Sequence, residues 1–206
     1  MRVWLCVVVV LLGGCMTHPP MDAAQRPAVW AQPSAALSQA GLQNVYQIDD
    51  GLYRAEQPSD DVLAQLFAGT FTTPAGVRFK TVVNLRETPL DAPLALPDSQ
   101  TQLVDLSLKT WDVEDQDILA FLRVATNPAQ RPVIVHCRHG ADRTGTMVAA
   151  YRMVVQGWSA DAALAEMQQG GFGYHPIWVN LKRRIAQLPV VQMRERLGLP
   201  TQVVRQ

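Results

Sequence analysis

The sequence lacks any excess of charge of one sign: eighteen Lys and Arg side chains balance eighteen Asp and Glu side chains among its 206 residues. A protein that binds nucleic acid needs a basic face to neutralise phosphates, so this balance argues against a nucleic-acid partner. No group of Cys and His residues has metal-ligand spacing, and we expect neither a metal nor another cofactor. Any anion must therefore be recognised by a local arrangement of donors.

Long apolar runs are also missing, apart from residues 3–12, which follow Arg2. Ten helical residues reach about 15 Å, half the thickness of a bilayer core. The run is therefore too short for a membrane span and predicts a signal peptide over residues 1–14.

This apolar run ends in Leu12-Gly13-Gly14-Cys15, which resembles a bacterial lipobox. The resemblance implies that Cys15 becomes the first residue after cleavage and carries a lipid that anchors the protein to a membrane. Met16 occupies the position after the cysteine at which an Asp would act as a retention signal. Because no Asp is present there, the sequence favours the outer membrane of a Gram-negative cell, facing the periplasm. The alternative is ordinary secretion, with Cys15 as an incidental cysteine.

Cysteine is scarce, with three residues in the whole chain. Cys6 would be removed with the signal peptide and Cys15 would be acylated, so Cys137 has no intramolecular disulfide partner in the mature protein. A lone thiol in an oxidising compartment is a liability unless it has a function. Cys137 is therefore a candidate functional residue before any motif is considered.

The rest of the chain divides by composition. Residues 15–41 are rich in Pro, Ala and Gln and predict a tether with little fixed structure. Residues 42–189 alternate strand and helix patterns, which predicts one α/β domain with a central, mainly parallel sheet flanked by helices. Residues 190–206 have no strong pattern and are expected to form a C-terminal tail. We expect strands at 45–48, 52–54, 81–85, 103–106 and 133–135, and helices at 60–67, 118–125, 147–154, 160–167 and 176–188.

The strand Val133–Val135 runs into His136-Cys137-Arg138-His139-Gly140-Ala141-Asp142-Arg143-Thr144-Gly145, and a helix follows. A tight loop ahead of a helix points successive backbone N–H groups into one concavity that binds anions. Gly140 and Gly145 permit backbone angles that a β-carbon would resist. Arg143 can bind two phosphate oxygens with its planar guanidinium. The same N–H groups and helix dipole favour negative sulfur, so we expect Cys137 to act as a thiolate nucleophile.

The order His-Cys, five residues, then Arg-Thr-Gly after a buried strand resembles the signature loop of the protein tyrosine phosphatase superfamily. Residues 52–58, 80–87, 150–159 and 171–175 resemble its compact, dual-specificity-like bacterial branch, and the match covers residues 45–188. The resemblance implies the cysteine-phosphatase fold and a phosphatase that hydrolyses phosphomonoesters, chiefly phosphotyrosine of a protein substrate, through a phosphocysteine intermediate.

The resemblance also implies residue roles. Cys137 would attack phosphorus, and Arg143 would bind the phosphoryl oxygens. Thr144 would donate its hydroxyl to the thiolate, a role compatible with capping the helix. His136 would order the loop through hydrogen bonds. The remaining phosphate-binding positions would contribute mainly backbone amides, with their side chains at the rim: Arg138, His139, Gly140, Ala141 and Asp142.

The leaving oxygen needs a proton, and in this family an aspartate of an upstream loop supplies it. Asp105 lies in an expected strand. Asp117 begins an expected helix, for which Asp115 is a natural N-cap. Asp112 follows Trp111 in the connecting loop. We choose Asp112 as the general acid, with Asp115 as the alternative.

Three further residues have structural interpretations. Arg54 and Arg86 are expected to form structural ion pairs, and His175, beside Pro176, is expected to cap a helix or to lie at the surface. 

Three alternatives remain open. The same loop serves inositol phosphate and phosphoinositide phosphatases, although Asp142 would repel a second substrate phosphate unless it faces away and pairs with a cation. A non-catalytic module that binds phosphoproteins and a rhodanese-like sulfurtransferase are the others. No pattern indicates the oligomeric state.

Overall fold

The computed structural model describes residues 26–88, 91, 94–95 and 98–201, so the predicted signal peptide and Cys15 lie outside the described residues. The strands are β1 (Gln32–Pro33), β2 (Tyr46–Asp49), β3 (Leu52–Ala55), β4 (Thr81–Asn84), β5 (Gln102–Asp105) and β6 (Val133–His136). The helices are α1 (Ala35–Gln39), α2 (Asp60–Phe67), α3 (Asp115–Thr126), α4 (Asp142–Val154), α5 (Ala160–Gln169), α6 (Val179–Ala186) and α7 (Val190–Arg196).

The six strands form one sheet in the order β1-β2-β3-β6-β4-β5. The β1–β2 and β2–β3 pairs are antiparallel, whereas β3, β6, β4 and β5 run parallel to one another. The predicted α/β class with a mainly parallel sheet is therefore confirmed. Strand β6 lies in the middle, between β3 and β4, and the residue that follows it emerges at the centre of the carboxyl edge.

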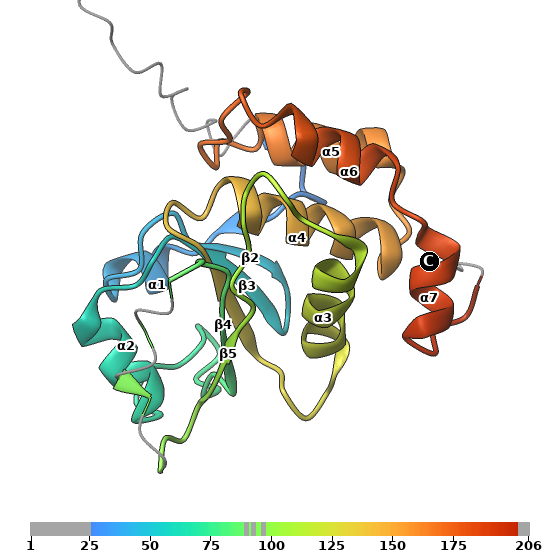
Figure 1. Cartoon of the computed structure of the whole chain (residues 1–206). Coiled ribbons are helices and arrows are strands. Elements are labelled where there is room, and N and C mark those ends of the chain that lie inside the picture. Colours follow the sequence, from blue (N-terminus) through green and yellow to red (C-terminus); the bar gives the residue numbers. More distant parts are fainter. Residues whose placement is uncertain (1–25, 89–90, 92–93, 96–97, 202–206) are drawn as a thin grey trace, which may run out of the picture.

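Strand β6 is buried on both faces, as its continuous apolar sequence predicts. Val133 and Val135 belong to the core that α3 to α7 cover, while Ile134 belongs to the core on the side of α1 and α2. Figure 1 shows these two groups of helices on opposite sides of the sheet. Helix α4 packs against α3, α5, α6 and α7, so the helix that follows β6 is fixed on several sides.

Residues 26–41 differ from the loosely structured tether that their composition predicts. Strand β1 pairs with β2, and the Ala31 amide donates to Glu166 Oε1 at 2.6 Å. Arg26 is buried, donates to the Gly170 carbonyl at 2.6 Å and lies over the Tyr46 ring. These partners come from distant parts of the chain, which explains why composition alone does not reveal them.

Helix α6 begins at Val179, so the prediction that it starts at Pro176 is wrong. The Trp178 amide donates to the His175 carbonyl at 3.1 Å, and the Tyr174 hydroxyl donates to the Trp178 carbonyl at 2.6 Å. These two hydrogen bonds hold residues 175–178 in a turn outside the helix, and the Ile177 side chain there is 78% exposed.

Helix α7 occupies the start of the segment expected to be a tail. Its Met193 is buried against the core, and Arg194 donates to the Val154 carbonyl. These two contacts hold α7 against the domain, although no strong periodicity in its sequence predicts a helix. 

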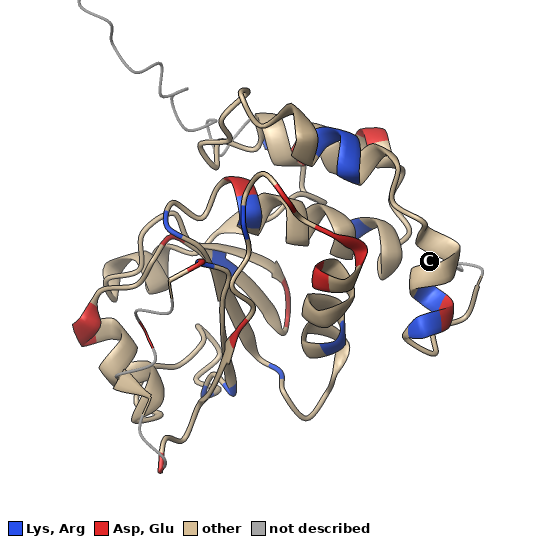
Figure 2. Ribbon diagram, in the orientation of Figure 1, with Lys and Arg blue, Asp and Glu red and all other residues tan. Residues whose placement is uncertain are grey.

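Charged residues follow no single face of the fold. In Figure 2, Lys and Arg occur on several helices and in loops, and Asp and Glu are scattered among the same elements. This distribution agrees with the zero formal net charge of the sequence.

Candidate active site

Cys137 lies directly after β6, at the start of a loop that ends where α4 begins at Asp142. Its side chain is 3% exposed. Within the loop, Gly140 has φ +65°, and a β-carbon there would lie 2.5 Å from the Ala55 carbonyl oxygen. Only glycine fits this close approach to the end of β3. The expectation that Gly145 permits an unusual backbone angle is wrong, because Gly145 lies inside helix α4. Its missing side chain instead lets Met167 of α5 pack close to α4.

The carbonyl groups of the loop are held outward by donors from the β2–β3 side of the sheet. The Gln57 amide donates to the Arg138 carbonyl at 3.3 Å, and Asn44 Nδ2 donates to the His139 carbonyl at 2.8 Å. Arg54 Nη2 donates to the Gly140 carbonyl at 2.6 Å. The N–H and C=O of one peptide unit point in opposite directions, so these bonds turn the following amides away from β3. The amides of residues 138–142 have no acceptor among the described residues, as an anion-binding loop requires.

Arg143 reaches across the carboxyl ends of two neighbouring strands. Its Nη1 donates to the Leu85 carbonyl, just after β4, and to the Leu108 carbonyl, beyond β5, each at 3.2 Å. Within the described residues, Nε and Nη2 have no hydrogen-bond acceptor. The arginine is thus fixed through Nη1 and keeps two donor nitrogens, Nε and Nη2, for a bound anion.

Thr144 is buried in the first turn of α4, and its hydroxyl has no hydrogen-bond partner among the described residues. The helix N-cap is Ala141, so Thr144 does not cap the helix. A buried hydroxyl without a partner is costly, which favours a role toward a group such as the Cys137 sulfur.

His136 is ordered by a residue that sequence reasoning missed. Its Nε2 lies 2.8 Å from Asp91 Oδ2, and both side chains are fully buried. Asp91 Oδ1 also accepts from Gln57 Nε2 at 2.8 Å. Burial alone would raise the pKa of Asp91. The hydrogen bond from His136, the charge interaction with His136 and the hydrogen bond from the Gln57 side chain together outweigh burial and lower the pKa of Asp91. No spacing or motif in the sequence singles out Asp91, because the contact forms only when the loop after β4 returns to β6.

Of the candidate acids, three have structural partners. Asp105 accepts from Asn84 Nδ2 at 2.8 Å, and burial raises its pKa. Asp117 accepts from the Glu114 amide at 2.9 Å in a capping box, and Asp115 pairs with Arg184 at 3.0 Å. The N-cap of α3 is Glu114 rather than Asp115.

The Asp112 carboxylate makes no hydrogen bond or ion pair with any described residue. It lines a hollow of about 200 Å³ together with Trp111 and residues of α6. Its loop is attached to the phosphate loop through the bond from Arg143 to Leu108. The structure thus places Cys137 at the start of the phosphate loop and Arg143 and Thr144 in the first turn of α4 that follows it, with Asp112 on an adjoining loop.

Asp142 faces away from the loop centre, the alternative that the sequence left open. Asp142 Oδ1 accepts a hydrogen bond from the His175 backbone amide at 2.9 Å, and Asp142 Oδ2 lies 2.8 Å from His175 Nδ1. The His175 and His139 rings lie 5.7 Å apart at the rim. Asp142 therefore holds the segment before α6 against the phosphate loop, and it provides no argument against a second substrate phosphate.

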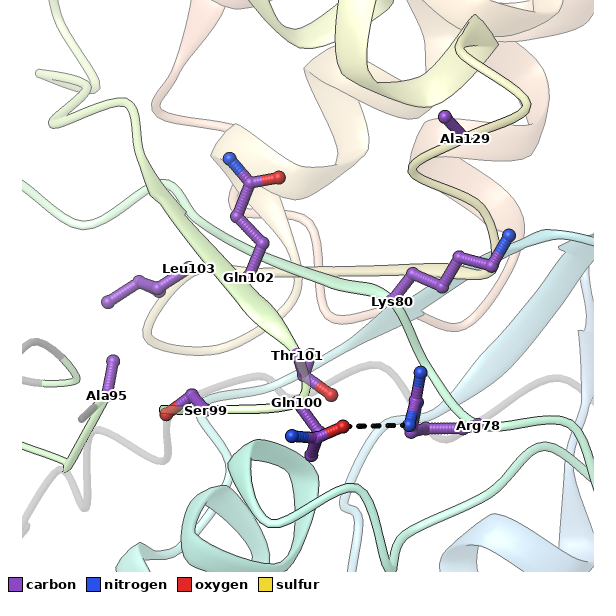
Figure 3. Close-up of a pocket in the computed structure, with 9 residues that line it drawn as sticks. All are labelled: Arg78, Lys80, Ala95, Ser99, Gln100, Thr101, Gln102, Leu103 and Ala129. Carbon is purple, nitrogen blue, oxygen red and sulfur yellow. Dashed lines mark hydrogen bonds between the residues drawn. The ribbon is translucent and has the colours of Figure 1, made fainter. Parts of the chain in front are cut away.

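A larger hollow, of about 580 Å³, lies elsewhere. Figure 3 shows its lining, including Arg78, whose Nη1 donates to Gln100 Oε1 at 3.2 Å. Lys80 and Thr101 precede β4 and β5, so this hollow lies at the amino ends of strands that are parallel to β6. Cys137 follows the carboxyl end of β6, and the hollow therefore belongs to the opposite edge of the sheet.

Comparisons with known proteins agree with this geometry. Residues 37–177 match the family model described as DSP-PTPase phosphatase fused to NAD+ Kinase. The dual specificity protein phosphatase TpbA of Pseudomonas aeruginosa is 36% identical over 167 residues, which cover 79% of this chain and 68% of the relative. Its crystal structure in complex with pTyr has a TM-score of 0.67 at 30% identity and covers 84% of this chain and 98% of that one. The inositol diphosphatase DSP3 of Arabidopsis thaliana is 24% identical, with 61% of each chain covered.

The family model spans more than half of the chain, and the loop from His136 to Gly145 has the geometry of an anion cradle around a cysteine. The chain belongs to the dual-specificity-like bacterial branch of the protein tyrosine phosphatase superfamily and is a protein-tyrosine/dual-specificity phosphatase.

Proposed function

We propose that this phosphatase acts chiefly on phosphotyrosine in proteins and that Cys137 is its nucleophile. The observation that carries the proposal is the set of acceptor-free amides at 138–142, which follows a buried cysteine and is completed by the two available donors of Arg143. This arrangement binds a phosphoryl group opposite the sulfur.

The proposed reaction has two steps. In the first, the Cys137 sulfur bonds to phosphorus, the ester oxygen leaves with a proton from Asp112, and Arg143 binds the phosphoryl oxygens. In the second, water attacks phosphorus and gives a proton to the Asp112 carboxylate, which restores the acid, and the P–S bond breaks. The Thr144 hydroxyl stabilises the departing thiolate, while the His136–Asp91 pair keeps the loop in place.

Apolar side chains near the loop support an aromatic substrate. Trp111 is 62% exposed and Ile177 is 78% exposed. Ile177 lies between His175, which is bonded to Asp142, and Asn180, whose Nδ2 donates to the Thr110 carbonyl at 2.9 Å. The segment that carries Ile177 therefore joins the phosphate loop to the Trp111 loop, where a phenyl ring would bury apolar surface. The relative's complex with pTyr supports the same substrate class.

We expect the mature protein to show a higher kcat/KM on phosphotyrosine peptides than on phosphoserine or phosphothreonine peptides or an inositol polyphosphate. Ile177→Ser should lower kcat/KM on the tyrosine peptide about 5-fold, which corresponds to losing about 1 kcal/mol of apolar contact. Val29→Ser, at an exposed position outside the site, is the matched control. A higher kcat/KM on the inositol polyphosphate would contradict the proposed substrate.

An inositol phosphate substrate is the second candidate. The similarity to the inositol diphosphatase DSP3 favours it, and the pairing of Asp142 with His175 removes one source of repulsion. The substrate comparison above decides between the two candidates.

We also propose that the signal peptide over 1–14 is removed and that a lipid on Cys15 anchors the protein to the outer membrane, facing the periplasm. Among the described residues, no helix is both long and apolar enough to cross a membrane. Ten residues separate Cys15 from Arg26, where the described structure begins. Fully extended, they would span at most about 35 Å, so the domain would stay close to the bilayer.

Cys15→Ala should abolish metabolic lipid labelling and the lipoprotein-type cleavage, because the acylated sulfur is gone. Cys6→Ala is the control, since it also removes a cysteine from the amino-terminal region and should leave labelling unchanged. Recovery of native, unlabelled protein in the soluble periplasmic fraction would contradict the anchor.

A further inference from the structure

Arg54 of β3 is a fully buried arginine that lies behind the phosphate loop. Its Nη2 donates to the Gly140 carbonyl at 2.6 Å, and its Cζ lies 3.7 Å from the centroid of the Phe172 ring. Nε and Nη1 are buried and have no hydrogen-bond partner among the described residues. The ion pair expected from the sequence is therefore wrong, because no carboxylate lies within salt-bridge distance of Arg54 in the described chain.

The nearby carboxylate is already paired. Glu166 binds Arg152 through both oxygens, at 2.7 and 2.8 Å, and one of them also accepts from the Ala31 amide. Burial lowers the pKa of Arg54 to about 10, while the charges of Glu166, Cys137 and Tyr46 raise it and that of Arg152 lowers it. Arg54 thus stays protonated at neutral pH and adds a positive charge beside the phosphate loop without an ion-pair partner.

The bond to Gly140 has a geometric consequence. The Gly140 carbonyl and the Ala141 amide belong to one planar peptide unit and point in opposite directions. Holding that carbonyl against Arg54 directs the Ala141 amide away from β3, toward the concave side of the loop. A planar guanidinium that stacks on Phe172 can make this bond in a fixed orientation, which a lysine would define less well.

We propose that Arg54 is a positioning residue for catalysis: it orients the Gly140–Ala141 peptide, and its buried charge stabilises negative sulfur at Cys137 and the bound phosphoryl group. The proposal rests on the function of Cys137 as the nucleophile. A positive charge in a weakly polarisable interior acts on neighbouring anions more strongly than a solvated one. The phosphatase would then rely on a second arginine, behind the loop, in addition to Arg143.

The test compares Arg54→Gln, which keeps an amide donor but removes the charge, with Arg54→Lys, which keeps the charge. Each variant is examined for kcat and KM on an aryl phosphate and for the pH dependence of Cys137 alkylation by iodoacetate. For Arg54→Gln we expect the pH of half-maximal alkylation to rise by about one unit, which corresponds to a 10-fold smaller ionisation constant of the thiol. We also expect kcat to be at least about 10-fold lower. For Arg54→Lys the alkylation profile should stay within about 3-fold of the wild-type profile at each pH.

Arg194→Met is the matched control, because Arg194 is also buried and bonded to a carbonyl, but at α7. It should lower the thermal midpoint without moving the alkylation profile. Equal profiles for folded Arg54→Gln and wild type, or the same shift for Arg54→Gln and Arg54→Lys, would reduce Arg54 to packing and overturn the proposal. If iodoacetate labels Cys137 in the wild type without inactivating it, the nucleophile assignment fails and this proposal fails with it.

Discussion

Replacing Cys137 by serine is expected to lower kcat on an aryl phosphate by about 10⁴-fold or more while leaving the binding of a phosphotyrosine peptide intact. The serine hydroxyl is far less nucleophilic than a thiolate at neutral pH, so the first chemical step is lost. The acceptor-free amides at 138–142 and the Arg143 donors do not depend on the sulfur and remain in place. Steady-state turnover and calorimetric titration with the peptide measure the two effects separately.

The intermediate gives an independent measurement for the same variant. Rapid acid quench of the wild-type protein with a radiolabelled aryl phosphate should trap labelled phosphocysteine, and Cys137→Ser should trap none. Turnover close to the wild-type rate in Cys137→Ser would rule out nucleophilic catalysis at this residue.

The core of this site could be predicted because its determinants are local in the chain. Val133–Val135, Cys137, Gly140 and Arg143 are close in sequence, and a buried strand followed by a glycine-containing loop and a helix has few possible geometries. The two cores on either face of β6 follow from the same continuous apolar strand.

The contacts that hold the loop in shape could not be predicted in this way. Asn44, Arg54 and Asp91 reach His139, Gly140 and His136 from distant positions in the sequence. Each depends on the strand order and on the return of a loop to the carboxyl edge, and a single sequence shows neither. Buried polar residues of this kind have no periodicity to reveal them, and the sequence predicted only an ordinary ion pair for Arg54.

Asp112→Asn is expected to slow the hydrolysis of substrates with basic leaving groups by about 10²- to 10³-fold and that of substrates with acidic leaving groups by less than about 3-fold. An alkoxide or a simple phenoxide needs a proton as it departs, whereas a nitrophenoxide leaves without one. The measurement is kcat/KM across a series of aryl phosphates of increasing leaving-group basicity. The plot against leaving-group pKa should be shallow for the wild-type protein and steep for the variant.

Asp115→Asn is the matched control, because Asp115 lies three residues further along and its carboxylate pairs with Arg184 at 3.0 Å. That ion pair is partly exposed, so its loss should have a small effect that is the same for every leaving group. Asp105 and Asp117 are bonded to Asn84 and to the Glu114 amide, which leaves Asp112 as the loop carboxylate without a described partner. A flat response for Asp112→Asn together with a steep one for Asp115→Asn would transfer the acid role to Asp115, in which case the bond to Arg184 must break before the proton can be delivered.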